Sequence, residues 1–102
     1  MSKIVKSVLE EELLRLQHFL RSLVSKLKEY PQGYLLKRRI RGKIYYYLSY
    51  REGDKIRQKY LGALRENESE KIREQIKKRI VLKDQLMDAK KNVVYLKKLL
   101  KK

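Results

Sequence analysis

Two long stretches of this chain place apolar residues at alternating intervals of three and four, a spacing typical of helices that pack along a shared apolar seam. In the first stretch these residues are Leu9, Leu13, Leu16, Leu20, Leu23, Leu27 and Tyr30. In the second they are Leu82, Leu86, Ala89, Val93, Leu96 and Leu100. The pattern predicts two long helices, residues 1–30 and 63–102, that form a coiled-coil hairpin.

The polar residues near the ends of the first stretch predict where its helix begins and ends. Ser7 followed by Glu10 fits a capping box, in which a hydroxyl and a carboxylate satisfy free backbone amides, and Ser2 is an alternative start. Pro31 and Gly33 then end the helix.

The second helical stretch begins less sharply and contains an interruption. Asn67 with Glu70 gives another capping pattern, although the helix could begin as early as Ala63. Arg79 falls where the apolar stripe requires an apolar residue, so the spacing shifts phase between Ile76 and Leu82. We expect a bend or a change of packing partner near Arg79.

Residues 33–62 carry the β pattern of the chain, with many tyrosine and isoleucine residues, which favour strands. Short reversals at Arg41-Gly42 and Gly53-Asp54 separate three predicted strands, Tyr34–Ile40, Lys43–Arg51 and Lys55–Leu61. An antiparallel meander of this size needs a helix against one face to be stable. The predicted fold is therefore α+β and mainly helical, a single domain in which two long helices flank a three-stranded meander.

Two-residue turns would sort the strand residues onto two faces, because directly opposed residues share a face. One face collects Tyr34, Leu36, Tyr45, Tyr47, Ile56 and Tyr60, together with Arg38, Ser49 and Arg51. We expect this mostly apolar face to pack on the helices. The other face collects five cations around a centre of two tyrosines and two leucines, Tyr46, Tyr50, Leu35 and Leu48. We expect this face to lie open to solvent.

The net charge of +16 is densest in the predicted sheet, where residues 34–62 carry nine basic and two acidic side chains. Such an excess repels itself and favours a polyanionic partner. Cations that contact phosphates and rings that stack on bases are what a nucleic-acid-binding surface needs. The predicted nucleic-acid-binding residues are Lys37, Arg39, Tyr46, Tyr50, Lys55, Arg57 and Lys59.

Little in the sequence supports catalysis, metal binding or a cofactor. His18 is the only histidine, there is no cysteine, and no glycine-rich phosphate loop is present. No apolar run is long enough to span a bilayer, and charged residues interrupt the N-terminal segment where a signal peptide would be apolar. We expect a non-enzymatic, cytoplasmic protein that does not insert into a membrane.

The segment Tyr45-Tyr46-Tyr47-Leu48-Ser49-Tyr50-Arg51-Glu52-Gly53, followed by Tyr60-Leu61-Gly62, resembles a signature of small, uncharacterised basic proteins of archaea, bacteria and their mobile elements. In these proteins helices precede and follow a tyrosine-rich meander. The strand pattern also resembles, more loosely, the arm-binding domains of tyrosine recombinases, which read DNA with a three-stranded sheet. That resemblance implies DNA rather than RNA as the ligand.

Together these features predict a nucleic-acid-binding protein that uses a basic, tyrosine-containing sheet face and forms a homodimer through its helices. The alternative is a structural or adaptor protein whose coiled coil binds a partner protein. The clean apolar stripes of the two helices favour this alternative.

Overall fold

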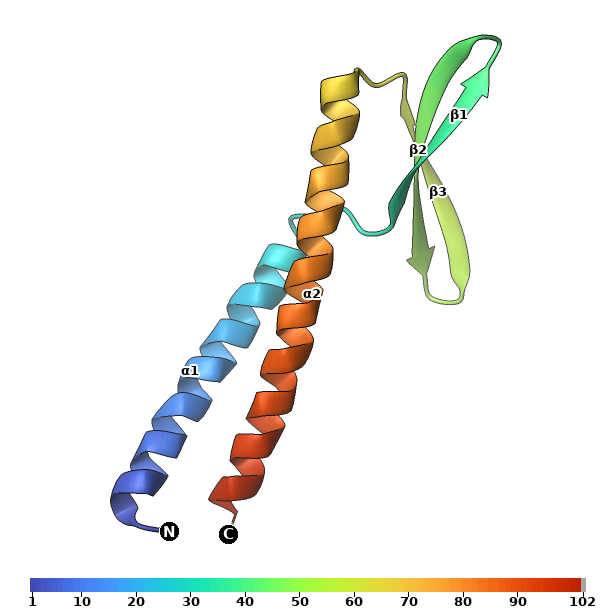
Figure 1. Ribbon diagram of the computed structural model, residues 1–102. Coiled ribbons are helices and arrows are strands. Elements are labelled where there is room, and N and C mark those ends of the chain that lie inside the picture. Colours follow the sequence, from blue (N-terminus) through green and yellow to red (C-terminus); the bar gives the residue numbers. More distant parts are fainter. Residues whose placement is uncertain (102) are drawn as a thin grey trace. The chain divides into compact units, whose positions relative to one another are not determined.

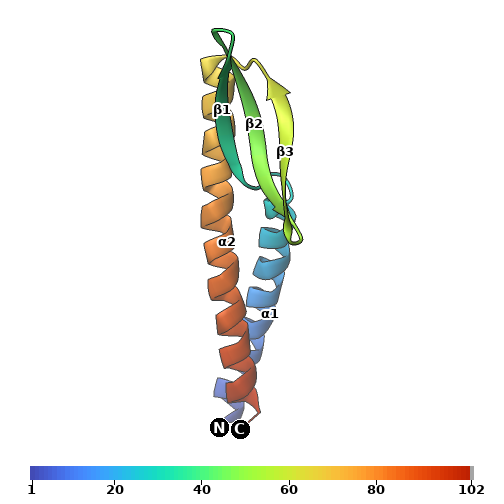
Figure 2. The ribbon, with the colours of Figure 1, turned by 90° about the vertical axis from the view of Figure 1, so that its right-hand side faces the viewer.

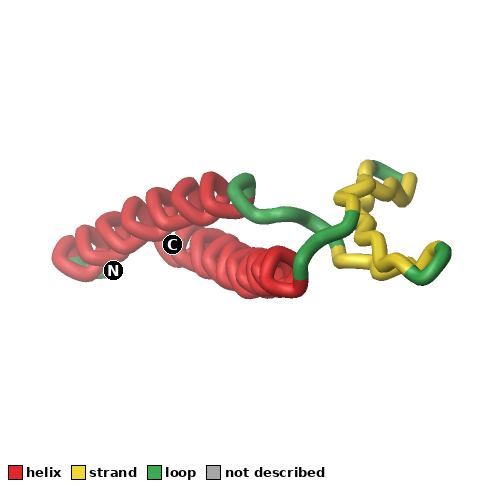
Figure 3. Tube along the Cα trace, turned by 90° about the horizontal axis from the view of Figure 1, so that it is seen from above, coloured by secondary structure: helices red, strands yellow, loops and turns green. Residues whose placement is uncertain are grey.

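The computed structural model of this chain describes residues 1–101 and contains two helices and three strands (Figure 1). In chain order the elements are α1 (Lys3–Leu27), β1 (Tyr34–Ile40), β2 (Lys43–Glu52), β3 (Lys55–Gly62) and α2 (Glu66–Leu100). Figure 3 shows the loops that join the strands to the helices, residues 28–33 and 63–65. The prediction of two long helices flanking a three-stranded antiparallel sheet is confirmed.

Helix α1 begins at the alternative start, so the predicted capping box at Ser7 is wrong. Ser2 is the N-cap residue, and its hydroxyl accepts a hydrogen bond of 3.2 Å from the amide of Val5. The helix ends at Leu27 rather than at residue 30, because a residue that precedes proline is disfavoured in the helical conformation. One ion pair joins Glu12 to Arg15, and the hydrogen bond from Arg15 lowers the pKa of the Glu12 carboxyl.

Helix α2 begins at Glu66, three residues after the predicted start of the segment. Asn67 is therefore the second residue of the helix and not its cap. The carboxylate of Glu68 instead accepts a hydrogen bond of 3.4 Å from the amide of Arg65, which is half of a capping box. Acidic residues in this first turn also favour the positive end of the helix dipole.

The chain divides into two compact units, and the division runs through α2. The first unit contains residues 1–29 and the chain from Val81 onward, and the second contains residues 30–80. The boundary lies beside the predicted phase shift at Arg79. The expected change of packing partner is therefore confirmed, since α2 belongs to one unit before residue 81 and to the other after it.

In the first unit, α1 packs along the later part of α2 as an antiparallel hairpin (Figure 1). Its core consists of Leu16, Val93 and Leu96, with Leu9, Leu13, Leu20 and Leu99 packed against it. Most of these residues belong to the two predicted apolar stripes. The pairing of the two helices within one chain is thus a property of the fold.

In the second unit, the three strands form an antiparallel sheet in the order β1-β2-β3. Ile40 pairs with Lys43 and Glu52 pairs with Lys55, so both predicted two-residue turns are confirmed. Gly42 and Gly53 both have positive φ, as the hairpin turns require. The register shifts at Tyr46/Tyr47, which pair with Gly62 and Tyr60 respectively, so β3 carries an extra residue there.

The sheet lies beside the first half of α2, as Figures 1 and 2 show. Tyr46 of β2 and Ile76 of α2 are buried in this unit, and Ser69 of α2 is almost fully buried. The guanidinium of Arg79 donates a hydrogen bond of 3.2 Å to the carbonyl oxygen of Tyr30, just before β1. The charged Arg79 thus stands in the apolar stripe at the position where its side chain bonds the backbone just before β1.

The loop before β1 approaches the backbone of β2 so closely that only glycine fits at position 33. Gly33 has a φ of 104°, and a Cβ atom there would overlap the carbonyl oxygen of Ser49. We expect Gly33→Ala to unfold the sheet or to lower its stability by several kcal/mol. Gly42→Ala is the matched control, because Gly42 also has positive φ but a Cβ there meets open space. Its cost should be about 1–2 kcal/mol. Urea denaturation followed by circular dichroism compares the two, and equal costs would contradict the close approach.

Candidate nucleic-acid interface

The strand register divides the side chains of the sheet into two faces. The first, here called the tyrosine face, carries Tyr34, Leu36, Arg38, Ile40, Lys43, Tyr45, Tyr47, Ser49, Arg51, Ile56, Gln58 and Tyr60. The second, here called the helix face, carries Leu35, Lys37, Arg39, Ile44, Tyr46, Leu48, Tyr50, Glu52, Lys55, Arg57 and Lys59. Every residue that the sequence assigns to a face lies on that face. The register adds Ile40, Lys43 and Gln58 to the first face, and Ile44 and Glu52 to the second.

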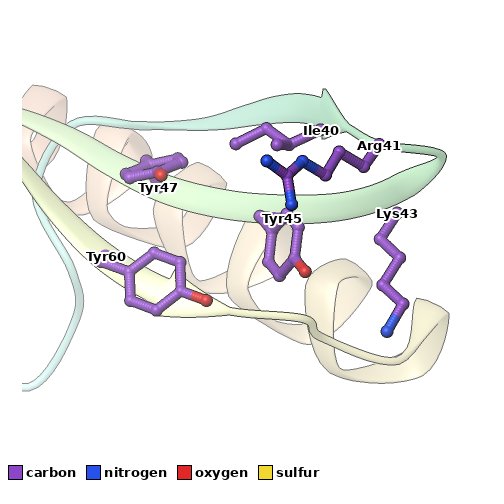
Figure 4. A pocket seen from close by; sticks show the side chains of 6 residues that line it. All are labelled: Ile40, Arg41, Lys43, Tyr45, Tyr47 and Tyr60. Carbon is purple, nitrogen blue, oxygen red and sulfur yellow. The ribbon is translucent and has the colours of Figure 1, made fainter.

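Helix α2 covers the face that was expected to be exposed. Tyr46, at the centre of the helix face, is only 6% exposed, whereas Tyr34 and Tyr60 on the tyrosine face are each 58% exposed. In Figure 4 the tyrosine side chains lie on the side of the sheet turned away from the helix behind it. The expectation that the tyrosine face packs on the helices is therefore wrong.

The distribution of apolar residues among the strands explains this outcome. On the helix face, the central strand β2 carries the apolar column Ile44, Tyr46, Leu48 and Tyr50, and the cations stand on the two edge strands. A helix about 10 Å wide can cover the central column while the long cationic side chains reach water on either side. A count of charges over the whole face does not distinguish the edge strands from the central strand, so it does not reveal the apolar column.

The predicted site residues consequently separate into two groups. The five cations Lys37, Arg39, Lys55, Arg57 and Lys59 are all exposed, on the edge strands of the helix face. Arg57 also forms an ion pair of 3.2 Å with Glu52. Tyr46 is buried and Tyr50 is partly buried, so Tyr46 can support the sheet but its ring is not open to a base.

The tyrosine face instead presents a cluster of three rings that belong to two neighbouring strands. The ring centroids of Tyr47 and Tyr60 are 5.3 Å apart, and those of Tyr45 and Tyr60 are 6.3 Å apart. The rings are tilted by 55° and 39° to each other, so their faces are not stacked. Such a cluster packs well within itself and still leaves ring surface open to solvent.

Arg38 extends this cluster across the sheet. Its guanidinium carbon lies 4.9 Å from the centroid of the Tyr47 ring, a cation–π geometry. The same guanidinium donates a hydrogen bond of 3.2 Å to the side-chain oxygen of Gln58 on β3. Arg38 therefore lies along the sheet, over Tyr47, and forms a bridge between the two edge strands.

A hollow of about 790 Å³ opens beside the cluster, lined by Ile40, Arg41, Lys43, Tyr45, Tyr47 and Tyr60 (Figure 4). Half of its lining residues are tyrosines, and two cations, Arg41 of the first turn and Lys43 at the start of β2, stand at one end. A smaller hollow of about 380 Å³ lies at the other end of the face, lined by residues that include Tyr34, Arg51 and Ile56.

The charge on the tyrosine face has a single sign. Arg38, Lys43 and Arg51 lie on it, Arg41 lies in the adjoining turn, and none of its residues is acidic. The strand residues of this face therefore attract an approaching anion, while the two turns add one charge of each sign, Arg41 in the first and Asp54 in the second. Within residues 1–101, His, Cys, Asp and Glu side chains form no group of three that could hold a metal ion.

Sequence reasoning placed Arg38 on the tyrosine face but did not select it, Arg41 or Lys43 as candidate binding residues. The signal that identifies the exposed face is the distribution of cations by strand rather than by face. Apolar side chains that fill the central strand on one face mark the side that a helix can cover.

Comparison with known proteins assigns the chain to a family. Residues 4–74 match the family described as Domain of unknown function (DUF6788), and the chain belongs to this family. The match includes α1, the whole sheet and the start of α2. No curated protein and no solved structure matches the chain, so the resemblance to recombinase arm-binding domains gains no support. In the described part of the chain, neither helix has the length and apolarity that crossing a membrane requires.

Because Tyr46 is buried and Tyr34 is exposed, the same substitution should have a large effect on stability at Tyr46 and a small one at Tyr34. Tyr46→Ala should lower the free energy of unfolding by about 3 kcal/mol or more, because it empties the core between the sheet and α2. Tyr34→Ala should change it by about 0.5 kcal/mol. Chemical denaturation of both variants measures the difference, and a larger cost for Tyr34→Ala would show that the faces are assigned wrongly.

Proposed function

We propose that this member of the family binds nucleic acid, without catalysing a reaction, through the tyrosine face of its sheet. The observation that carries the proposal is an exposed surface that combines tyrosine rings with three cations on its strands and Arg41 in the first turn, and whose strand residues include no acidic side chain. Phosphates supply most of the affinity of nucleic-acid complexes, and aromatic rings provide contacts to bases or sugars.

The charge of the whole chain supports the same proposal. A net charge of +16 on 102 residues destabilises the compact state through repulsion, and a polyanion relieves it. The exposed edge cations of the helix face flank the sheet and add to the field that attracts a polyanion. We assign them a secondary role in affinity, because α2 covers the centre of that face.

DNA is the first candidate ligand, and only the resemblance in strand pattern favours it over RNA. The proposed site of action is the cytoplasm. The rival function is that of an adaptor that binds a partner protein through its helices. Apolar side chains exposed on the helices support that rival, and they equally support the homodimer that we include in the proposal. Those on the first unit include Ile4, Val8, Phe19, Met87 and Val94.

Charge reversal on the two sides of the sheet distinguishes the surfaces. We expect Arg41→Glu with Lys43→Glu to abolish binding at moderate salt. For single substitutions to alanine, each lost phosphate contact should reduce the slope of log affinity against log salt by about 1. The matched control is Arg57→Glu with Lys59→Glu, which makes the same change in net charge on the helix face. The control should weaken binding less.

Fluorescence anisotropy with a labelled duplex and a labelled single strand, over a range of salt concentrations, provides the measurement. Equal losses for the two double variants would mean that the charge acts as a whole, and would contradict the assignment to the tyrosine face. No binding of either probe at low salt would contradict nucleic-acid binding itself and leave the adaptor function.

The exposed apolar residues of α2 test the homodimer. Met87 and Val94 lie seven residues apart, two helical turns, and each is 52% exposed. Met87→Glu with Val94→Glu should convert a dimer into a monomer and leave the helical circular dichroism signal unchanged. Sedimentation velocity measures the mass, and Lys91→Gln with Lys98→Gln is the control for charge, because both lysines are exposed and this variant also lowers the net charge by two. A wild-type monomer at all concentrations would refute the dimer.

A further inference from the structure

We propose that the tyrosine face binds unpaired nucleotides, with bases stacked on its exposed rings, and that it therefore prefers a single strand to a duplex. This inference rests on the proposed function and names its ligand more closely. Three features of the face carry it: the orientation of Arg38, the exposure of the edge tyrosines, and the two hollows that these tyrosines line.

The first feature is that the polar side chains at the centre of the face are already engaged with each other. Reading a duplex in its major groove requires side chains such as Arg or Gln that extend toward base edges. Here Arg38 lies over the Tyr47 ring and donates its hydrogen bond to Gln58. These two central residues thus form part of the platform and do not extend from it toward base edges.

The second feature is that ring surface is most open on the edge strands. Tyr60 on β3 and Tyr34 on β1 are each 58% exposed, although Tyr60 also contacts the rings of Tyr45 and Tyr47. A ring that is held by neighbours on one side and open on the other can receive a base without first being ordered. Stacking of this kind needs an unpaired base, since a paired base offers only its edges in the grooves.

The third feature is that each exposed ring borders a hollow with a cation beside it. Tyr60 lines the larger hollow together with Arg41 and Lys43, and Tyr34 lines the smaller one together with Arg51. A base needs an aromatic wall, and the phosphate attached to it needs a cation nearby. The two hollows lie on the same face, on either side of the Arg38–Gln58 bridge, so one strand that crosses the sheet would reach both.

The test compares three labelled probes of equal length with the full-length protein: a single DNA strand of mixed sequence, the same sequence as a duplex, and a sugar-phosphate strand without bases. The wild-type protein should bind the single strand most tightly. Tyr60→Ala should weaken binding to the single strand by about 5-fold to 100-fold, and should leave binding to the abasic strand unchanged.

Tyr95→Ala is the matched control, because Tyr95 is an exposed tyrosine (62%) on the part of α2 that belongs to the first unit, and it is not part of the tyrosine face. It should bind all three probes like the wild type. Tyr60→Phe, which keeps the ring, should retain the binding of the single strand. These controls separate the loss of a stacking ring from the loss of any surface tyrosine.

Tyr60→Trp provides a second readout that does not depend on how well Tyr60→Ala folds. The sequence contains no tryptophan, so the emission of this variant reports on position 60 alone. The single strand should quench that emission by stacking, and the abasic strand should not. Quenching by both strands, or by neither, would overturn the inference.

The remaining outcomes distinguish this inference from the proposed function. Tightest binding to the duplex, or equal binding to the abasic and the normal single strand, would overturn base stacking while nucleic-acid binding remained supported. If none of the three probes binds at low salt, the proposed function itself fails and the inference fails with it.

Discussion

The packing of the central strand against the first half of α2 is the contact on which the arrangement of this protein depends. A three-stranded sheet is not stable by itself, so one of its faces must be covered. Tyr46 is buried there and its apolar neighbours on β2 are partly buried, while Ile76 and Ser69 of α2 are buried in the same unit. Because that face is covered, the opposite face must present its rings and cations to solvent. The candidate interface is a consequence of this packing.

Tyrosine makes this outcome possible because its side chain is stable in both environments. The same residue type supplies the buried centre of the helix face and the exposed cluster of the tyrosine face. A phenol ring can bury apolar area, and its hydroxyl can remain solvated when the ring is at a surface. The number of tyrosines therefore indicates a ring-rich sheet but does not indicate which rings are available to a ligand.

Helix α2 serves two packing partners, and its sequence records the change between them. Ile76 faces the sheet, whereas Val93 and Leu96 face α1. Arg79 lies between these two stretches, where its guanidinium bonds the carbonyl of Tyr30. A single continuous apolar stripe could serve only one partner, so the phase shift in the stripe is required by the fold.

The sequence by itself determined the elements, the two turns, the sets of residues that share a face, and the strand register except for the extra residue of β3 opposite Tyr46 and Tyr47. These follow from local rules: apolar spacing, glycine at positive φ and the alternation of side chains along a strand. Only the tertiary structure decided which face α2 covers, and so which tyrosines are exposed. The helix face carries six charged residues and the tyrosine face three, so a count of charges alone would leave the helix face exposed. The choice depends on the apolar column being concentrated on the central strand, opposite a helix that is distant in sequence, a contact that no local pattern specifies.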